Sequence, residues 1–115
     1  MSHETLTLET YAGQAEGCRI LRVHGPLTLQ GVFDFQTALR TDPAPLLVLD
    51  LSLVPYMDSA GMGAVINYYV SCQRNGRKLA VSGVNPRVLE LFRLTKVEAL
   101  LTIVPTVADA EKALA

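Results

Sequence analysis

The sequence predicts an α/β domain: a mixed, mostly parallel sheet of four to five strands with about four helices packed against it. Three observations predict this class. A hairpin of two strands opens the chain, short continuously apolar runs follow it, and segments of helical periodicity separate these runs. We expect one domain over residues 1–115, ordered from about residue 5 to residue 114, because a chain of this length has room for one hydrophobic core.

The first half of the chain predicts a hairpin, a helix and a buried strand. Residues 5–11 alternate polar and apolar side chains, and residues 18–24 follow a short turn as the second strand. Apolar residues then recur with helical spacing from Leu29 until Pro43 stops the helix. The run LLVLDL at residues 46–51 is typical of a strand buried on both faces.

The second half predicts alternating helices and strands. After a loop at residues 52–58, a long helix runs from Ser59 to Arg74, and its inner face is expected to carry Met62, Val65, Ile66, Tyr69 and Val70. The remaining predicted elements are a strand at 79–82, a helix that starts at Asn85-Pro86 and carries Val88, Leu89 and Phe92, a strand at 101–104 and a closing helix at 107–114. In such folds the helix starts meet at the ends of the strands, where sites are usually found.

Composition excludes several classes of function. A formal net charge of −1 gives no overall electrostatic reason to bind nucleic acid or an anionic membrane. The most apolar region, residues 46–70, is interrupted by polar residues and a proline, so no membrane span is expected, and the first ten residues lack a secretory pattern. Two cysteines form neither a disulfide framework nor a zinc signature. We therefore expect a cytoplasmic protein without a metal or cofactor.

The segment LVLDLSLVPYMDSAGMGAV, residues 47–65, carries the most information. Ser59 suits the cap position of the long helix, and Asp58 places a negative charge near the positive end of the helix dipole. Gly61 and Gly63 need another explanation, because each glycine inside a helix costs about 1 kcal/mol relative to alanine. They either leave the first turn bare for a partner surface or a phosphate, or they let the helix pack tightly on its own sheet.

Large apolar residues surround this turn. Tyr56, Met57 and Met62 flank Ser59 and could anchor a binding partner. The alternative is that at least two of the three belong to the core, and Met62 is the first choice for a core position.

The same residues make the chain recognisable. Leu49–Ser52 followed by Met57–Gly63 resembles the signature of STAS domains, the family of bacterial anti-sigma factor antagonists. The resemblance continues through Asn75-Gly76, Val81–Pro86 and Leu94-Thr95, so it covers nearly the whole chain. It implies the predicted order of elements and a regulatory function rather than an enzymatic one.

The resemblance also implies a mechanism for transcription control. An anti-sigma factor that is itself an ATP-binding serine kinase phosphorylates the serine at the position of Ser59. The unphosphorylated antagonist binds this kinase and frees the sigma factor; phosphorylation ends the binding, and a phosphatase restores it. We expect a monomer or a weak homodimer that contacts its partner through Thr28, Tyr56, Met57, Asp58, Ser59, Ala60, Gly61, Met62 and Gly63.

Two positions depart from the family pattern. Thr28 stands where an aspartate is expected, which puts in doubt any contact that the aspartate would make near Ser59, although a threonine can still cap the following helix. Lys96 stands where a glycine is common, which indicates a small change at a helix end.

Three alternatives stay open. Some STAS domains are subunits of transporters or signalling complexes without a sigma-factor role. A response-regulator receiver would be phosphorylated on an aspartate such as Asp50, but the first strand end lacks the acidic residues that hold magnesium. An enzyme using Ser59 as nucleophile would need a histidine base, and only His3 and His24 exist. We read His24 as a strand-face residue, His3 as part of a terminal tail, and Asp50 as a strand-end residue that binds loop backbone.

Overall fold

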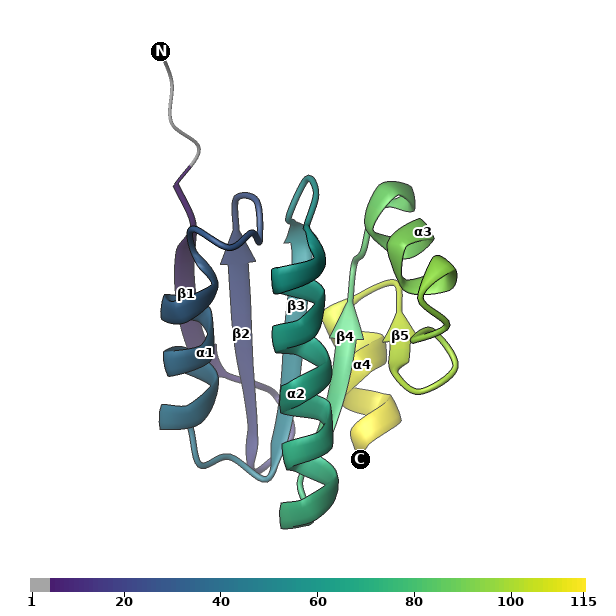
Figure 1. The fold of residues 1–115 in the computed structure, drawn as a ribbon. Helices are drawn as coiled ribbons and strands as arrows, with labels where there is room; N and C mark the ends of the chain where they lie inside the picture. Colours follow the sequence, from purple (N-terminus) through teal and green to yellow (C-terminus); the bar gives the residue numbers. More distant parts are fainter. Residues whose placement is uncertain (1–4) are drawn as a thin grey trace.

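The computed structural model describes residues 5–115, and within them the elements follow the predicted order (Figure 1). They are β1 (Thr7–Ala12), β2 (Cys18–His24), α1 (Val32–Thr41), β3 (Leu46–Leu53), α2 (Ser59–Asn75), β4 (Lys78–Ser82), α3 (Pro86–Leu94), β5 (Thr102–Val104) and α4 (Val107–Leu114).

The sheet is mixed and has the order β1-β2-β3-β4-β5. β1 pairs antiparallel with β2, and the three other pairings are parallel, each bridged in sequence by one helix. Figure 1 shows α1 and α2 side by side over one face of the sheet and α4 over the other. The predicted fold class is confirmed. None of the helices in residues 5–115 is long and apolar enough to cross a membrane.

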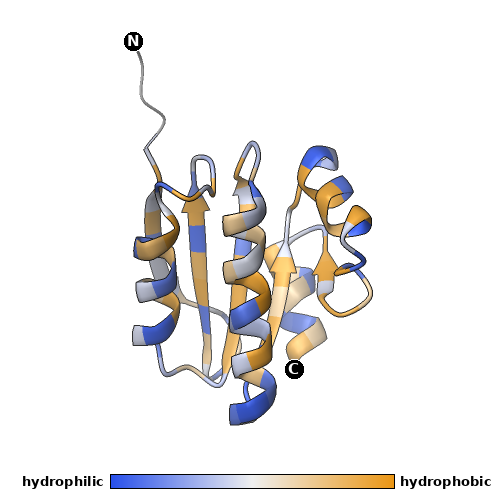
Figure 2. Cartoon of the chain, viewed as in Figure 1, coloured by the Kyte–Doolittle hydropathy of each residue, from blue (hydrophilic) through white to orange (hydrophobic). Residues whose placement is uncertain are grey.

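The core has one apolar layer on each side of the sheet. The larger layer lies under α1, α2 and α3 and is centred on Phe35, Leu49 and Phe92, while the smaller one lies under α4 around Val48 and Ala80. β3 therefore contributes to both layers, which is why its sequence is apolar at nearly every position. Figure 2 shows the strands mostly in hydrophobic colours and the hydrophilic colours gathered on the helices.

The first helix begins later than the periodicity predicts. Its first residue is Val32 and its N-cap is Gly31, which has no side-chain capping bond. The prediction that Thr28 caps this helix is wrong, because residues 28–31 form a separate turn in which the Gly31 N–H donates to the Thr28 carbonyl at 3.0 Å. The prediction that Leu29 belongs to the helical stripe is also wrong, since its side chain is 62% exposed.

The buried face of α2 is rotated from the predicted stripe. Tyr68 is buried, whereas Tyr69 is half-buried and Val70 is exposed. The reason is that α1 packs along one flank of α2, so the buried face extends to Ala64, Tyr68 and Cys72. A sequence pattern cannot reveal on which flank a neighbouring helix will lie.

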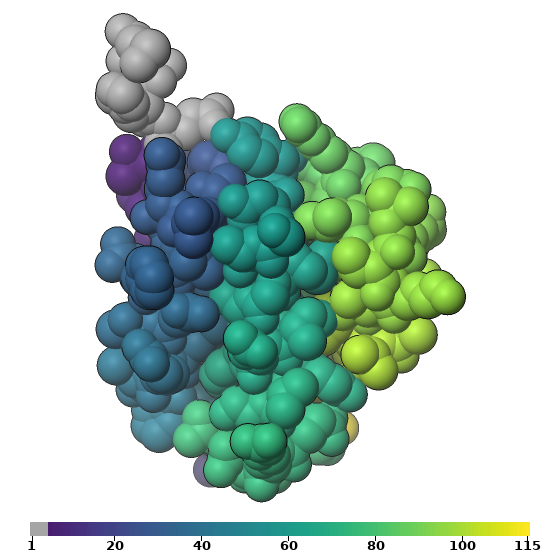
Figure 3. Space-filling view, viewed as in Figure 1, coloured from purple at the N-terminus to yellow at the C-terminus, as the bar shows by residue number. Residues whose placement is uncertain are grey.

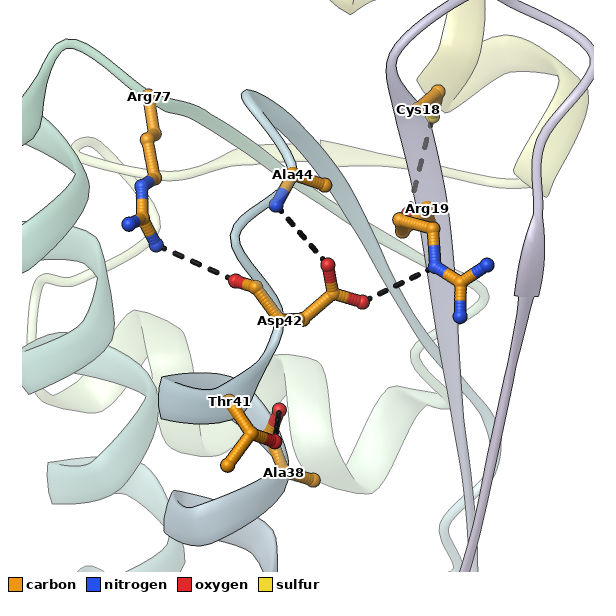
Figure 4. A network of polar contacts seen from close by, with 7 residues as sticks. All are labelled: Cys18, Arg19, Ala38, Thr41, Asp42, Ala44 and Arg77. Carbon is orange, nitrogen blue, oxygen red and sulfur yellow. Dashed lines mark hydrogen bonds and ion pairs between the residues drawn. The ribbon is translucent and has the colours of Figure 1, made fainter.

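The amino ends of the parallel strands are held by a polar network around Asp42 (Figure 4). Arg19 Nε contacts Asp42 Oδ2 at 3.2 Å, and the Ala44 N–H donates to Asp42 Oδ1 at 3.0 Å. Arg77 Nη1 donates to the Asp42 carbonyl at 3.4 Å. These bonds join β2, the loop after α1 and the loop before β4, at the opposite end of the sheet from Ser59.

Candidate functional site

The start of α2 is held by two loops at the carboxyl end of the sheet. Leu27, in the loop between β2 and α1, forms an isolated parallel bridge with Met57, in the loop between β3 and α2. The Leu27 N–H donates to the Tyr56 carbonyl at 3.1 Å, and the Asp58 N–H donates to the Leu27 carbonyl at 3.2 Å. This pairing extends the β2–β3 ladder up to the first residue of the helix and fixes its position.

Asp58, not Ser59, is the N-cap of α2. Its Oδ1 accepts from the Gly61 N–H at 3.0 Å, and its Oδ2 accepts from the Leu29 N–H at 3.0 Å. Partial burial raises the pKa of the Asp58 carboxyl, but the backbone donors, chiefly Gly61, then Leu29 and Ala60, lower it below its ordinary value overall. The carboxylate therefore joins the two loops as well as capping the helix.

The two glycines of the first turn have different surroundings. A Cβ atom on Gly61 would overlap the carbonyl oxygen of Leu27, so only glycine allows the helix to approach this strand-like segment. A Cβ atom on Gly63 would meet nothing within 4 Å. Each of the two explanations left open by the sequence therefore applies to one glycine: tight packing at Gly61 and an open surface at Gly63.

Ser59 is exposed as the first residue of α2, and its hydroxyl has no hydrogen-bond partner among residues 5–115. Ser59 and Gly63 are four residues apart and share the outward face of the helix. Met57 and Met62, by contrast, are only 8% and 5% exposed and belong to the larger apolar layer. The alternative that at least two of the three flanking apolar residues are core is thereby confirmed.

The third flanking residue, Tyr56, is half-buried at the edge of the site. The Arg87 guanidinium lies 5.0 Å from the centre of its ring. Asn85, the N-cap of α3, donates from its amide nitrogen to the carbonyls of Val54 and Pro55, both at 3.1 Å. The loop that carries Tyr56 is thus attached to the start of α3.

Sequence reasoning missed two exposed apolar side chains next to this turn. Leu29 is joined to Asp58 through its backbone, and Phe33 lies one turn further along, on α1, with 70% of its surface exposed. Phe33 lies three residues before Gln36 and seven before Arg40, both of which face α2, so it points to the same side. The sequence contained one signal for this exposed ring. Phe33 does not fit the helical spacing of the buried residues Val32, Phe35 and Leu39. Figure 3 shows α1 and α2 adjoining across this face.

Asp50 accepts a backbone hydrogen bond as the sequence indicated, but it lies within β3 rather than at the strand end, because β3 continues to Leu53. The residue is buried; its Oδ1 accepts from the Ser52 N–H at 3.0 Å, and its Oδ2 contacts Arg22 Nε at 3.1 Å. The strand order and the antiparallel first pair also differ from the receiver fold, in which the order is 2-1-3-4-5.

His24 is exposed at the end of β2, and His3 lies outside the described residues. Residues 5–115 contain no group of three or more metal-ligating side chains.

Comparison of the sequence with known proteins identifies a family and a named relative. The family model described as STAS domain matches residues 11–110. The anti-sigma-B factor antagonist of Staphylococcus aureus is 28% identical over 86 residues, which cover 72% of this chain and 80% of that protein.

Two solved structures have the same fold. An anti-sigma factor antagonist from Mycobacterium paratuberculosis has a TM-score of 0.85 and 22% identity, covering 96% of this chain and 94% of that one. The phosphorylated form of the Bacillus cell fate determinant SpoIIAA has a TM-score of 0.69 and 16% identity, covering 96% of this chain and 100% of that one. Because the family model spans most of the sequence and the fold agrees, the chain belongs to the STAS domain family.

Proposed function

We propose that this protein is an anti-sigma factor antagonist: a binding protein, not an enzyme, that is switched by phosphorylation of Ser59. The observation that carries the proposal is an exposed serine at a helix start that is held by the Asp58 cap, four residues before a glycine with no packing role of its own. The relative from Staphylococcus aureus, which carries the name of such an antagonist, supports this choice.

The contact surface we propose, called here the docking face, surrounds the start of α2. Ser59, Ala60 and Gly63 form its centre, and the exposed apolar side chains of Leu29 and Phe33 form its rim. A bare centre lets a partner backbone approach closely, and apolar side chains at a rim supply buried area on docking. Of the residues expected from the sequence, Thr28, Tyr56 and Asp58 border this face, while Met57, Gly61 and Met62 support it from the core.

Phosphate on Ser59 would act directly at this face. It adds about −1.5 to −2 charges beside the Asp58 carboxylate, and docking would have to desolvate both groups. A loss of about 3 kcal/mol at the interface lowers the affinity about a hundredfold. The domain itself stays folded, because a helix N-terminus favours negative charge and the phosphate would point to solvent.

The proposed partners follow from this switch. The partner bound by the unphosphorylated chain is an anti-sigma factor that also serves as the ATP-dependent serine kinase for Ser59. A phosphoserine phosphatase regenerates the binding form. The SpoIIAA neighbour, solved in a phosphorylated form, shows that a protein of this fold carries phosphate without losing the fold.

The test compares the intact protein, isolated from its native cells, with a Ser59→Ala version. We expect a phosphate that resists hydroxylamine and is absent from the Ser59→Ala protein. Ser52→Ala is the matched control, because Ser52 is an exposed serine at the end of β3 that lies outside the docking face. A hydroxylamine-labile phosphate, or one lost only with Ser52, contradicts the proposal.

The partner is identified by capture on the immobilised Ser59→Ala chain, followed by measurement of purified pairs. We expect a protein with a nucleotide-binding kinase domain that phosphorylates wild-type chain and not Ser59→Ala. Capture of a transporter or of a larger assembly without a kinase, together with no phosphate under any growth condition, would favour the alternative of a constitutive STAS subunit.

A further inference from the structure

A groove lies between α1 and α2, and none of its lining residues belongs to the docking face. The groove has a volume of about 360 Å³, which is within the range of small-molecule sites. Its walls include Gln36 and Arg40 from α1, Asn67 and Tyr68 from α2, and Arg77 from the loop before β4.

The charged side chains that line this groove are all positive. Its lining includes two guanidinium groups, Arg40 and Arg77, and no carboxylate. Burial raises the pKa of Tyr68 to about 12, and its neutral phenol already interacts with Cys72 and Arg77, so it adds no charge to the groove. The nearest acidic residue in the Arg77 network, Asp42, offers Arg77 only its backbone carbonyl, because its carboxylate binds Arg19 and the Ala44 N–H.

Several donors in the groove are available to a ligand. Within residues 5–115 the side chains of Arg40, Gln36 and Asn67 have no hydrogen bond or ion pair. The carboxyl ends of α1 and α2 lie near the groove, and each carries a partial negative charge of about half a unit. The full positive charges of Arg40 and Arg77 outweigh these two partial charges. Leu39 and Ala64 add an apolar part to the same wall.

We propose that this groove binds a small organic anion: a carboxylate or phosphate group held by Arg40 and Arg77, attached to a compact apolar body that packs on Leu39, Ala64 and the Tyr68 ring. Arginine suits both anionic groups because its planar donors bind two oxygens at once. The inference does not depend on the proposed function. Ala64 lies five residues along α2 from Ser59, about 7.5 Å by helical rise, so a bound anion would leave Ser59 accessible.

The test is an NMR titration of the full chain with benzoate, phenyl phosphate, inorganic phosphate and uncharged benzyl alcohol. We expect benzoate or phenyl phosphate to give saturable shifts of backbone amides in residues 36–40 and 64–71. Benzyl alcohol should bind more weakly because it lacks the charge. Inorganic phosphate alone should also bind more weakly, because it lacks the apolar body.

Variants decide whether the groove is responsible. Arg40→Gln should weaken binding of the better probe at least tenfold, because it removes a charged hydrogen-bond donor. Lys112→Gln is the control: it removes the same single charge from an exposed position on α4, on the other face of the sheet, and should leave binding unchanged. The spectrum of Arg40→Gln checks that it is folded. Absence of saturable shifts, equal binding of benzyl alcohol, or equal weakening by both variants would overturn the inference.

Discussion

The inward and outward sides of the first turn of α2 differ in how tightly they are packed. On the inward side, Gly61 admits the Leu27 carbonyl, and Met62 fills the core. On the outward side, within the part of the chain that the structure describes, the Ser59 hydroxyl has no hydrogen-bond partner and Gly63 faces open space. One side is constrained by packing, whereas the other has a glycine that packing does not require.

This difference separates a glycine that packing requires from one that packing does not require, within a single helical turn. Every glycine in a helix costs stability, so the question is what each one permits in return. For Gly61 the answer is visible inside the domain, because a side chain would meet backbone. For Gly63 no neighbour among residues 5–115 answers it, and the proposed docking face is the explanation to be tested. The following changes test the two sides separately.

The largest effect is expected on the inward side. Gly61→Ala would place a Cβ atom against the Leu27 carbonyl, and neither backbone can move without breaking the bridge between Leu27 and Met57. We expect a loss of about 3 kcal/mol in the free energy of unfolding, measured by urea denaturation. A variant as stable as the wild type would mean that the close approach is not required.

Removing the cap should have the next largest effect. Asp58→Ala leaves the Gly61 and Leu29 N–H groups without their acceptor, and we expect a loss of about 1–2 kcal/mol at pH 7. Asp58→Asn is the matched control, because asparagine retains a cap oxygen and should be destabilised less. Equal losses for the two variants would show that the charge, rather than the capping oxygen, is responsible.

The same carboxylate makes stability depend on acid. Its pKa is lower in the folded chain, so its contribution is complete above the unfolded value of about 4 and is lost as the pH falls through the folded pKa. We expect the wild type to lose more stability between pH 5 and pH 2 than Asp58→Asn does. Parallel urea titrations of both proteins measure this difference, and identical pH profiles would contradict it.

On the outward side, Gly63→Ala should reverse the sign of the stability effect. Alanine is the better helix former and the site has room for its methyl group, so we expect a gain of about 0.5–1 kcal/mol. The same change should weaken partner binding, since the methyl group enters the docking face. A variant that is more stable and binds equally well would exclude Gly63 from the interface.

The smallest stability effect is expected at the rim. Phe33→Ala removes a side chain that is 70% exposed, so the free energy of unfolding should change by less than about 0.5 kcal/mol. Its partner affinity should fall about tenfold, because docking would bury the exposed ring and full burial of a phenylalanine side chain contributes about 1.5–3 kcal/mol. The control is Val70→Ala, which shortens an exposed apolar side chain on α2 about two turns beyond Gly63. Equal affinities of both variants would remove Phe33 from the docking face.

Local patterns predicted most of the fold. The bounds of β2 and α4 agree with the expected residues 18–24 and 107–114, because a strand and a helix there are closed by clear turn or cap signals. Lys96, at a position where glycine is common, has a φ of 63° and is the one described non-glycine residue with a positive φ. The sequence therefore located a left-handed helix end even though the residue is unusual there.

The remaining features depend on contacts between distant segments. The cap at Asp58 and the close approach at Gly61 both require the Leu27–Leu29 loop, which is about thirty residues earlier in the chain. The late start of α1 follows from the turn at residues 28–31, and the burial of Tyr68 depends on how α1 lies against α2. The sequence could place Ser59 at a helix start, but not show which neighbouring glycine was free.

The most direct test of the central claim measures stability and affinity on one sample, a chain with phosphoserine at position 59. We expect its free energy of unfolding to stay within about 0.5 kcal/mol of the unmodified chain, because the group is at an exposed helix start. Its dissociation constant for the captured kinase partner should rise about a hundredfold. An unchanged dissociation constant, or a phosphate that unfolds the domain, would contradict a switch that acts only at the docking face.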